Sequence, residues 1–259
     1  MGSKPELLEK EAHEFLAQGN GREAYRLFKK AGDDYKRRGT HKEAALCLAS
    51  AASCWALKSG ERMFHNSSLA YEEAAEEAEL TGDLEYASLL YRQAAINFER
   101  DMEFFSFSDC LYRSRECLRK FLVRSLLMPR KIHNIGAAGV RQTETYGLFK
   151  RLFLCLSLTL SALIWGHGER PGRTFLSVLL VILLSAIIYT QGSLIRDTII
   201  FKPNFFQALY FSVITITTVG YGDITPVGIA RLIAMAEALC GICVVPIFIV
   251  GLSRRYLRV

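Results

Sequence analysis

The chain has 259 residues, 51% of them hydrophobic, and a formal net charge of +6 at pH 7. Its seven cysteines are odd in number, and the closely spaced pair Cys240 and Cys243 lies in an apolar segment without partner ligands, so they indicate neither a metal site nor a disulfide framework. The positive charge is small and lies beside the apolar segments of the second half, which argues against binding to nucleic acid.

Residues 1–128 are rich in alanine and charged residues and show helical periodicity. Breaks such as Gly19-Asn20-Gly21, Ser59-Gly60 and Thr81-Gly82-Asp83 predict six helices in antiparallel hairpins. A pattern of small and large residues recurs 43 positions apart and aligns Gly39, Ala44, Leu48, Ala51 and Ala52 with Gly82, Ala87, Tyr91, Ala94 and Ala95. At a shorter offset of 20 positions, the pattern aligns Ala24, Phe28 and Ala31 with Ala44, Leu48 and Ala51.

This pattern resembles tetratricopeptide-type repeats and the longer hairpins of soluble NSF attachment proteins. The resemblance implies a helical-repeat domain, and repeat stacks of this kind present a surface suited to a protein or peptide partner. A generic helical bundle is the alternative interpretation. Isolated histidines such as His13, His41 and His65 form no catalytic constellation, so we expect neither enzymatic activity nor a cofactor.

The second half begins with a predicted linker, residues 129–147, which contains Pro129 and several glycines. Residues 148–173 follow as an interfacial or re-entrant segment and a turn. The apolar run Leu152–Trp165 has fourteen residues, whereas a membrane span needs about 20. We therefore favour a segment that does not cross the membrane; if it did cross, the repeat domain would lie outside.

Residues 174–259 read as a pore domain with an apolar outer helix and an apolar inner helix. The predicted elements are the outer helix 174–190, the pore helix 204–217 capped by Asn204, the loop 218–222 and the inner helix 229–252. Most basic residues that flank these segments lie on the side opposite the loop. The positive-inside rule then places the repeat domain and the C-terminus in the cytoplasm of a multi-pass membrane protein.

The loop Thr218-Val219-Gly220-Tyr221-Gly222 is interpreted as a line of main-chain carbonyls, because its two glycines adopt left-handed backbone angles without steric penalty. Four such loops around one axis replace the water shell of a potassium ion. Together with Thr215, the loop resembles the signature of two-transmembrane-helix potassium channels. The resemblance implies an all-α homotetramer in the lipid bilayer, with K⁺ held at Thr218, Val219, Gly220 and Tyr221.

Several other residues are expected to support this function. Thr215, Asp223 and Glu237 are expected to support the selectivity filter, residues 218–222. Thr215 and Asp223 flank the filter, and Glu237 is an acid at membrane depth. Gly241 and Pro246 are interpreted as a gating hinge in the inner helix, although Gly241 is equally compatible with close helix packing. We expect the repeat domain to regulate the channel. A membrane-anchored scaffold and a poorly selective cation channel are the alternatives.

Overall fold

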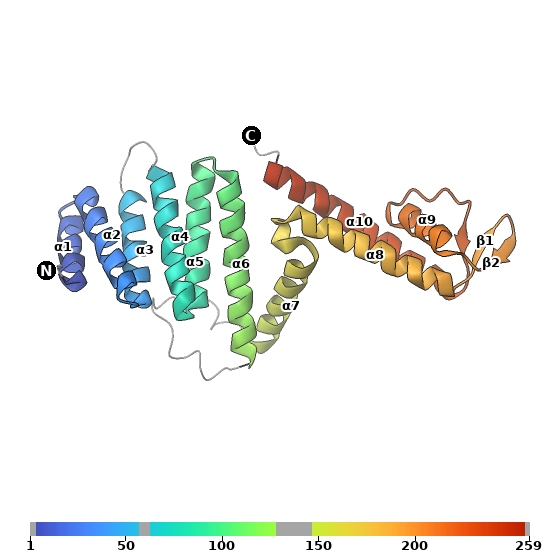
Figure 1. Cartoon of the computed structure of the whole chain (residues 1–259), viewed down its shortest axis with the longest axis horizontal. Coiled ribbons are helices and arrows are strands. Elements are labelled where there is room, and N and C mark those ends of the chain that lie inside the picture. The colour runs from blue at the N-terminus through green and yellow to red at the C-terminus, as the bar shows by residue number, and fades with distance from the viewer. Residues whose placement is uncertain (1–3, 57–62, 128–146, 257–259) are drawn as a thin grey trace. The chain divides into compact units, whose positions relative to one another are not determined.

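The computed structural model describes residues 4–56, 63–127 and 147–256. The chain divides into two compact units, Met1–Leu160 and Ser161–Val259. Helices dominate both units, as Figure 1 shows, and three short strands are the only sheet among the described residues. The all-α prediction is therefore confirmed. The predicted linker 129–147 lies outside the described residues except for Gly147.

The first unit is a stack of antiparallel helices in which each helix packs mainly against its neighbours in sequence (Figure 1). Asn20 and Asp83 cap two of these helices through their side chains. The break predicted at Ser59-Gly60 lies outside the described residues, but the six helices agree with the prediction. They are α1 (Pro5–Ala17), α2 (Gly21–Arg37), α3 (His41–Ala56), α4 (Met63–Thr81), α5 (Leu84–Arg100) and α6 (Phe104–Leu127).

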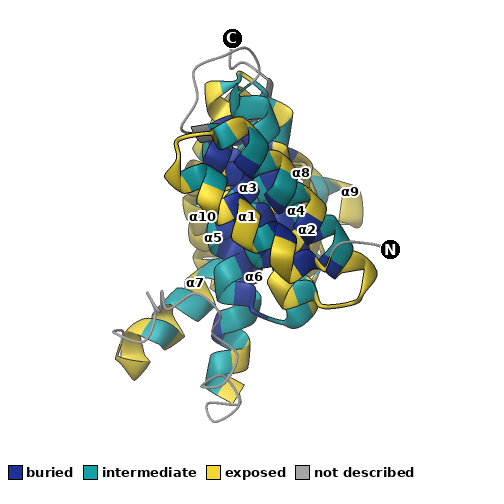
Figure 2. Cartoon of the chain, turned by 90° about the vertical axis from the view of Figure 1, so that its left-hand side faces the viewer, coloured by how far each residue is buried: buried dark blue, intermediate teal, exposed yellow. Residues whose placement is uncertain are grey.

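The core of the stack consists of the residues that recur in the sequence. Phe28, Leu48 and Tyr91 are at most 1% exposed, and the alanines aligned with them are completely buried. Small residues bring neighbouring helices close together, and the large side chains fill the space between them. Figure 2 colours these buried positions dark blue within α1–α6. The residues that recur in the sequence are therefore positions of the core rather than of the surface.

Helix α7 (Leu148–Trp165) differs from its predicted length. It has 18 residues because it begins at Leu148, before the expected run Leu152–Trp165. With the 3₁₀ turn η2 (Gly166–Gly168) it forms a 21-residue segment whose length and composition suit a membrane span. None of its residues is buried, and in Figure 2 it carries only intermediate and exposed positions. The length of the segment 148–168 therefore permits it to cross a membrane. Whether it does cross stays a prediction.

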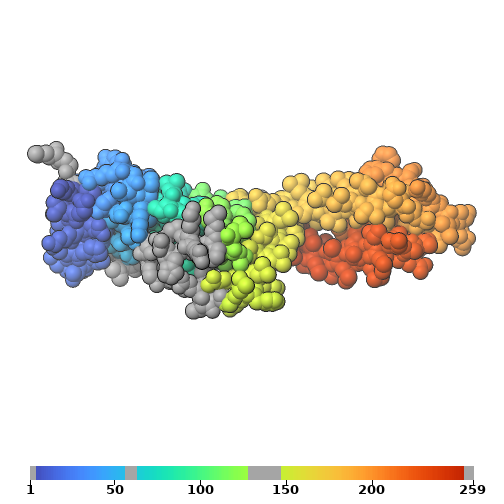
Figure 3. All heavy atoms as spheres, turned by 90° about the horizontal axis from the view of Figure 1, so that it is seen from below, coloured from blue at the N-terminus to red at the C-terminus, as the bar shows by residue number. Residues whose placement is uncertain are grey.

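The second unit contains two further helices that are long and apolar enough to cross a membrane, α8 (Pro171–Gln191) and α10 (Ile229–Tyr256). A shorter apolar helix, α9 (Phe205–Ile216), packs against both of them. Figure 3 shows α10, in red, lying along α8 within this unit. The predicted outer, pore and inner helices all form; α8 begins three residues before the predicted start, and α10 ends at Tyr256 instead of residue 252.

A small antiparallel sheet was not predicted. Its strands β1 (Leu194–Arg196), β2 (Ile199–Phe201) and β3 (Thr225–Pro226) lie in the order β2-β1-β3. Asp197 and Thr198 both have positive φ, as a two-residue hairpin turn with the twist of its strands requires. The pairing of Ile195 with Thr225 attaches the segment after residue 222 to the hairpin that follows α8.

Candidate functional site

Helix α9, the predicted pore helix, has a well-formed N-terminus. The Asn204 side chain accepts a hydrogen bond from the Gln207 backbone N–H at 2.9 Å, and the Gln207 side chain accepts one from the Asn204 N–H at 3.0 Å. This capping box satisfies two backbone donors that the first turn leaves without helical partners. The predicted cap at Asn204 is confirmed. It fixes where α9 starts and therefore where its C-terminal end delivers the loop.

The loop residues that follow α9 alternate in backbone conformation. Thr218, Gly220 and Gly222 have positive φ angles of 58°, 51° and 80°, whereas Val219 and Tyr221 between them do not. Such alternation turns successive carbonyls toward one side of the loop. Thr218 is the one non-glycine residue of the three and adopts a conformation that side chains rarely take.

Hydrogen bonds to the end of α9 hold the start of this loop. The N–H groups of Val219 and Gly220 both donate to the Ile214 carbonyl, at 3.0 and 3.2 Å, and the Thr218 N–H donates to the Thr215 carbonyl at 3.0 Å. Within the described part of the chain, the carbonyls of residues 218–222 accept no hydrogen bond. The first three N–H donors of the loop are thus bound to α9, and its acceptors remain available to a cation.

Two predicted supporting residues occupy different environments. The Thr215 hydroxyl donates to the Phe211 carbonyl at 2.7 Å, so it bonds within its own helix and does not reach the loop. Asp223 lies directly after the loop, and its carboxylate accepts a hydrogen bond from the Tyr210 hydroxyl of α9 at 3.0 Å. Tyr210 was not identified from the sequence, because nothing in its spacing distinguishes it from an ordinary apolar position of the pore helix.

Glu237 of α10 is 3% exposed and lies behind the pore helix, where it joins three helices. Its carboxyl accepts a hydrogen bond from the Tyr189 hydroxyl of α8 at 2.7 Å and another from the Ser212 hydroxyl of α9. Ser212 also lies 3.1 Å from the Ile182 carbonyl of α8. Glu237 therefore contacts the middle of the pore helix rather than Thr215 or the loop. Tyr189 and Ser212 were missed, although both are polar positions in strongly apolar segments.

Gly241 lies one turn further along α10, against the end of the pore helix. A Cβ atom at Gly241 would stand 1.9 Å from the Ile216 carbonyl oxygen, so this position requires glycine for close approach. The contact between Gly241 and Ile216 lies four residues after the contact between Glu237 and Ser212 on both helices. The two are therefore successive contacts along one helix face. Pro246 lies inside α10, which continues as a helix past it to Tyr256.

Comparisons with known proteins agree with this geometry. Residues 176–258, about a third of the chain, match the model of a family described as "Ion channel". "Protein LctB" of Geobacillus stearothermophilus is 63% identical over 35 residues, which cover 14% of this chain and 26% of that protein. "Probable potassium channel protein 2" of Methanocaldococcus jannaschii is 53% identical over 49 residues, which cover 19% of this chain and 14% of that protein.

A second "Protein LctB", from Bacillus caldotenax, is 57% identical over 35 residues and is likewise covered over 26% of its length. The chain thus spans about a quarter or less of the curated relatives that it matches. No solved structure gives a significant match to the chain. The family resemblance is therefore carried by the second unit, which contains α8, α9, the loop and α10.

Proposed function

We propose that the second unit forms a potassium-selective pore when four copies assemble with residues 218–222 around one axis. The observation that carries the proposal is the loop itself, in which φ is positive at every second residue and the carbonyls accept no hydrogen bond within the described part of the chain. Rings of main-chain carbonyls of this kind replace the hydration shell of K⁺. The matches to the ion-channel family and to a potassium channel protein support the same function.

The exposure of the loop supports assembly. In a single chain Val219 is 53% exposed and Tyr221 is 72% exposed, and the neighbouring residues from Thr217 to Asp223 are exposed as well. One chain supplies only a quarter of each carbonyl ring, so an isolated subunit has no complete binding site. A homotetramer in a lipid bilayer completes the rings and covers these side chains. The apolar helices α8 and α10 suit that environment.

A flux assay tests the proposal. The full chain, reconstituted into liposomes, is expected to release K⁺ much faster than Na⁺. Gly220→Ala should abolish the selective flux, because its φ of +51° strains any residue with a Cβ atom. Gly228→Ala is the matched control, since Gly228 has a φ of +57°, also has no neighbour within 4 Å, and lies outside the filter. Equal K⁺ and Na⁺ permeability in the parent chain would contradict the proposal.

The first unit is proposed to bias opening from the cytoplasmic side. Its helices form a repeat stack, and such stacks offer extended surfaces to protein or peptide partners. A regulatory domain shifts a two-state pore only if it interacts differently with the two states. Deletion of residues 1–128 should therefore change the open probability while tetramers still form. An unchanged open probability in assembled tetramers would leave the stack without a gating role.

A further inference from the structure

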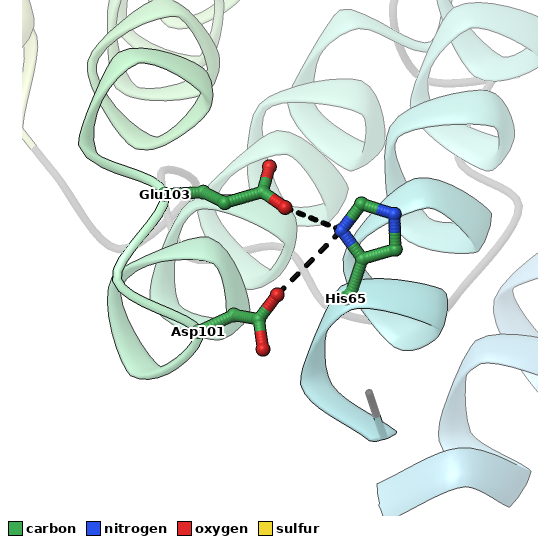
Figure 4. A group of neighbouring side chains, drawn as sticks. All are labelled: His65, Asp101 and Glu103. Atoms are coloured by element: carbon green, nitrogen blue, oxygen red, sulfur yellow. Dashed lines mark hydrogen bonds and ion pairs between the residues drawn. The ribbon is translucent and has the colours of Figure 1, made fainter. Parts of the chain in front are cut away.

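Three side chains with lone pairs converge at one end of the helical stack (Figure 4). His65 lies in the first turn of α4, Asp101 is the C-cap of α5, and Glu103 directly precedes α6. The His65 Nδ1 atom lies 2.5 Å from Glu103 Oε1 and 3.6 Å from Asp101 Oδ2. One possible ligand atom from each of the three residues lies within 4.8 Å of those of the other two.

The His65 Nδ1 atom faces two carboxylates, those of Asp101 and Glu103. An Nδ1–H group donates to only one of these carboxylates at a time. Among the described residues, no lysine or arginine forms an ion pair with Asp101 or Glu103. Asp101 also sits at the C-terminal end of α5, where the helix dipole disfavours a negative charge. In the part of the chain that the structure describes, the two carboxylates therefore have no lysine or arginine paired with them.

A second histidine–carboxylate pair in the same stack shows the difference. His41 Nδ1 lies 2.7 Å from Glu77 Oε2, but the other oxygen of that carboxylate is 3.1 Å from Lys36 Nζ. That pair thus contains its own cation and has one carboxylate fewer at the imidazole. The cluster at His65 has two carboxylates at the imidazole and, among the described residues, no paired lysine or arginine. Both differences favour a metal cation.

The chain geometry directs both acids toward the imidazole. Met102 stands between Asp101 and Glu103 with a φ of 61°, an unusual value for a residue other than glycine. Glu103 Oε2 accepts a hydrogen bond from the Ser106 hydroxyl at 3.2 Å, which orients the carboxylate with Oε1 toward His65. Metal-ligating carboxylates are commonly oriented by such an additional hydrogen bond.

We propose that His65, Asp101 and Glu103 bind one divalent first-row transition metal ion, with Zn²⁺ as the best fit. One imidazole nitrogen with two carboxylate oxygens suits zinc better than Ca²⁺ or Mg²⁺, which take six or more oxygen ligands or retain water. Bonds of about 2.1 Å in tetrahedral geometry separate neighbouring donors by roughly 3.4 Å. The His65–Asp101 distance of 3.6 Å already fits, and the half-exposed Glu103 has to move away from Nδ1 by roughly 1 Å.

Three protein ligands leave one tetrahedral position for water or for a partner's side chain. The ion would connect the beginning of α4 to the α5–α6 loop. The site concerns the first unit alone and stands whether or not the second unit conducts K⁺.

The test measures metal binding by the full, tag-free chain in detergent. Equilibrium dialysis against Zn²⁺ is expected to give one more ion per chain for the parent than for His65→Ala. Co²⁺, offered in its place, should develop visible absorption typical of tetrahedral coordination, and this absorption should be lost in His65→Ala. His41→Ala is the matched control, because it removes the other histidine–carboxylate contact and should bind as the parent does.

Asp101→Asn provides a second variant that keeps the size of the side chain, and it should weaken Zn²⁺ binding at least tenfold. Helical circular dichroism confirms that each variant is folded. The same stoichiometry for the parent, His65→Ala and Asp101→Asn would overturn the proposal. An equal loss in His41→Ala would overturn it too, since binding would then report surface histidines in general.

Discussion

The hydroxyl of Tyr210 on α9 donates a hydrogen bond to the carboxylate of Asp223, 3.0 Å away, across the loop of residues 218–222. The opposite end of the loop is held to the same helix by the N–H groups of Val219 and Gly220, which donate to the Ile214 carbonyl. Both ends of the loop are therefore attached to α9. Such attachment keeps a strained backbone in place where the sequence alone would not.

Tyr210→Phe should weaken the filter without disturbing the fold, because it removes one hydroxyl and leaves the ring. Among the described residues, the Asp223 carboxylate then loses its hydrogen-bond donor at the C-terminal end of the loop. We expect a channel whose K⁺ flux declines faster during sustained conduction and whose K⁺ over Na⁺ preference falls. Flux recorded in liposomes over time, with each ion separately, measures both changes.

Asp223→Asn separates the hydrogen bond from the charge. The asparagine oxygen still accepts from Tyr210, so this variant should resemble the parent if the hydrogen bond is what matters. If Asp223→Asn behaves like Tyr210→Phe, the negative charge of Asp223 is required and a neutral hydrogen bond is not enough. If neither variant differs from the parent, the contact does not support the filter.

Gly241→Ala tests whether this glycine serves packing or bending. Its Cβ atom would meet the Ile216 carbonyl oxygen at 1.9 Å, and backbone atoms do not move aside as a flexible side chain does. Forcing additional atoms into a packed contact costs typically about 1–3 kcal/mol. We expect a loss of tetramer stability of about this size and a loss of selective flux, since the end of the pore helix must shift.

Gly251→Ala is the control in the same helix. The nearest atom to its added Cβ is the Gly168 carbonyl oxygen at 3.6 Å, an ordinary contact, so the substitution should be neutral or slightly stabilising. Thermal unfolding in detergent compares the two variants. If Gly241→Ala is as stable as the parent and alters only the open probability, bending rather than packing explains the glycine.

Sequence reasoning located the elements whose structure is encoded locally. The capped pore helix and the loop glycines were predictable because Asn204, Gly220 and Gly222 impose their geometry on the residues beside them. The core alanines of the first unit were predictable from their recurrence. The length of α7 was not predictable from its apolar run alone, because the helix begins at Leu148 and includes the charged residues Lys150 and Arg151.

The contacts between distant segments were not predictable from one sequence. Tyr189 and Glu237 lie 48 residues apart, and Tyr210 and Asp223 meet only because the loop between them folds back. Glu237 was recognised as unusual because an acid at membrane depth is costly, but its partners depend on how three helices pack. The sequence likewise left the role of Gly241 open, since both interpretations require a residue without a side chain.

The first unit should become less stable at alkaline pH. Burial raises the pKa of the Cys47 thiol to about 12, and burial also raises that of Cys117 to about 12. In the unfolded chain these thiols ionise near pH 8.5, so above that pH the unfolded state loses protons that the folded state retains. Stability is therefore complete below about pH 8.5 and falls by up to about 1.4 kcal/mol per pH unit for each thiol as pH rises toward 12.

Denaturant unfolding of the full chain, followed between pH 8 and pH 11, measures this slope. Cys47→Ala removes the contribution of one thiol and should make the slope shallower, even though the smaller side chain lowers stability at every pH. A slope that is the same in Cys47→Ala and in the parent would show that this thiol is not responsible.

The last prediction concerns the carboxyl of Glu237, which joins α8, α9 and α10. Glu237→Ala leaves the buried Tyr189 hydroxyl without an acceptor, which should cost about 1–3 kcal/mol of tetramer stability. Glu237→Gln should stay close to the parent: the amide oxygen accepts from Tyr189, the amide N–H donates to Ser212, and Ser212 donates to the Ile182 carbonyl. Adding Tyr189→Phe to Glu237→Ala should recover part of the loss, because no donor is then left unpaired. Thermal unfolding of the tetramer and K⁺ flux decide the matter. A glutamine variant as damaged as the alanine variant would mean that the negative charge of Glu237, and not its hydrogen bonds, is required.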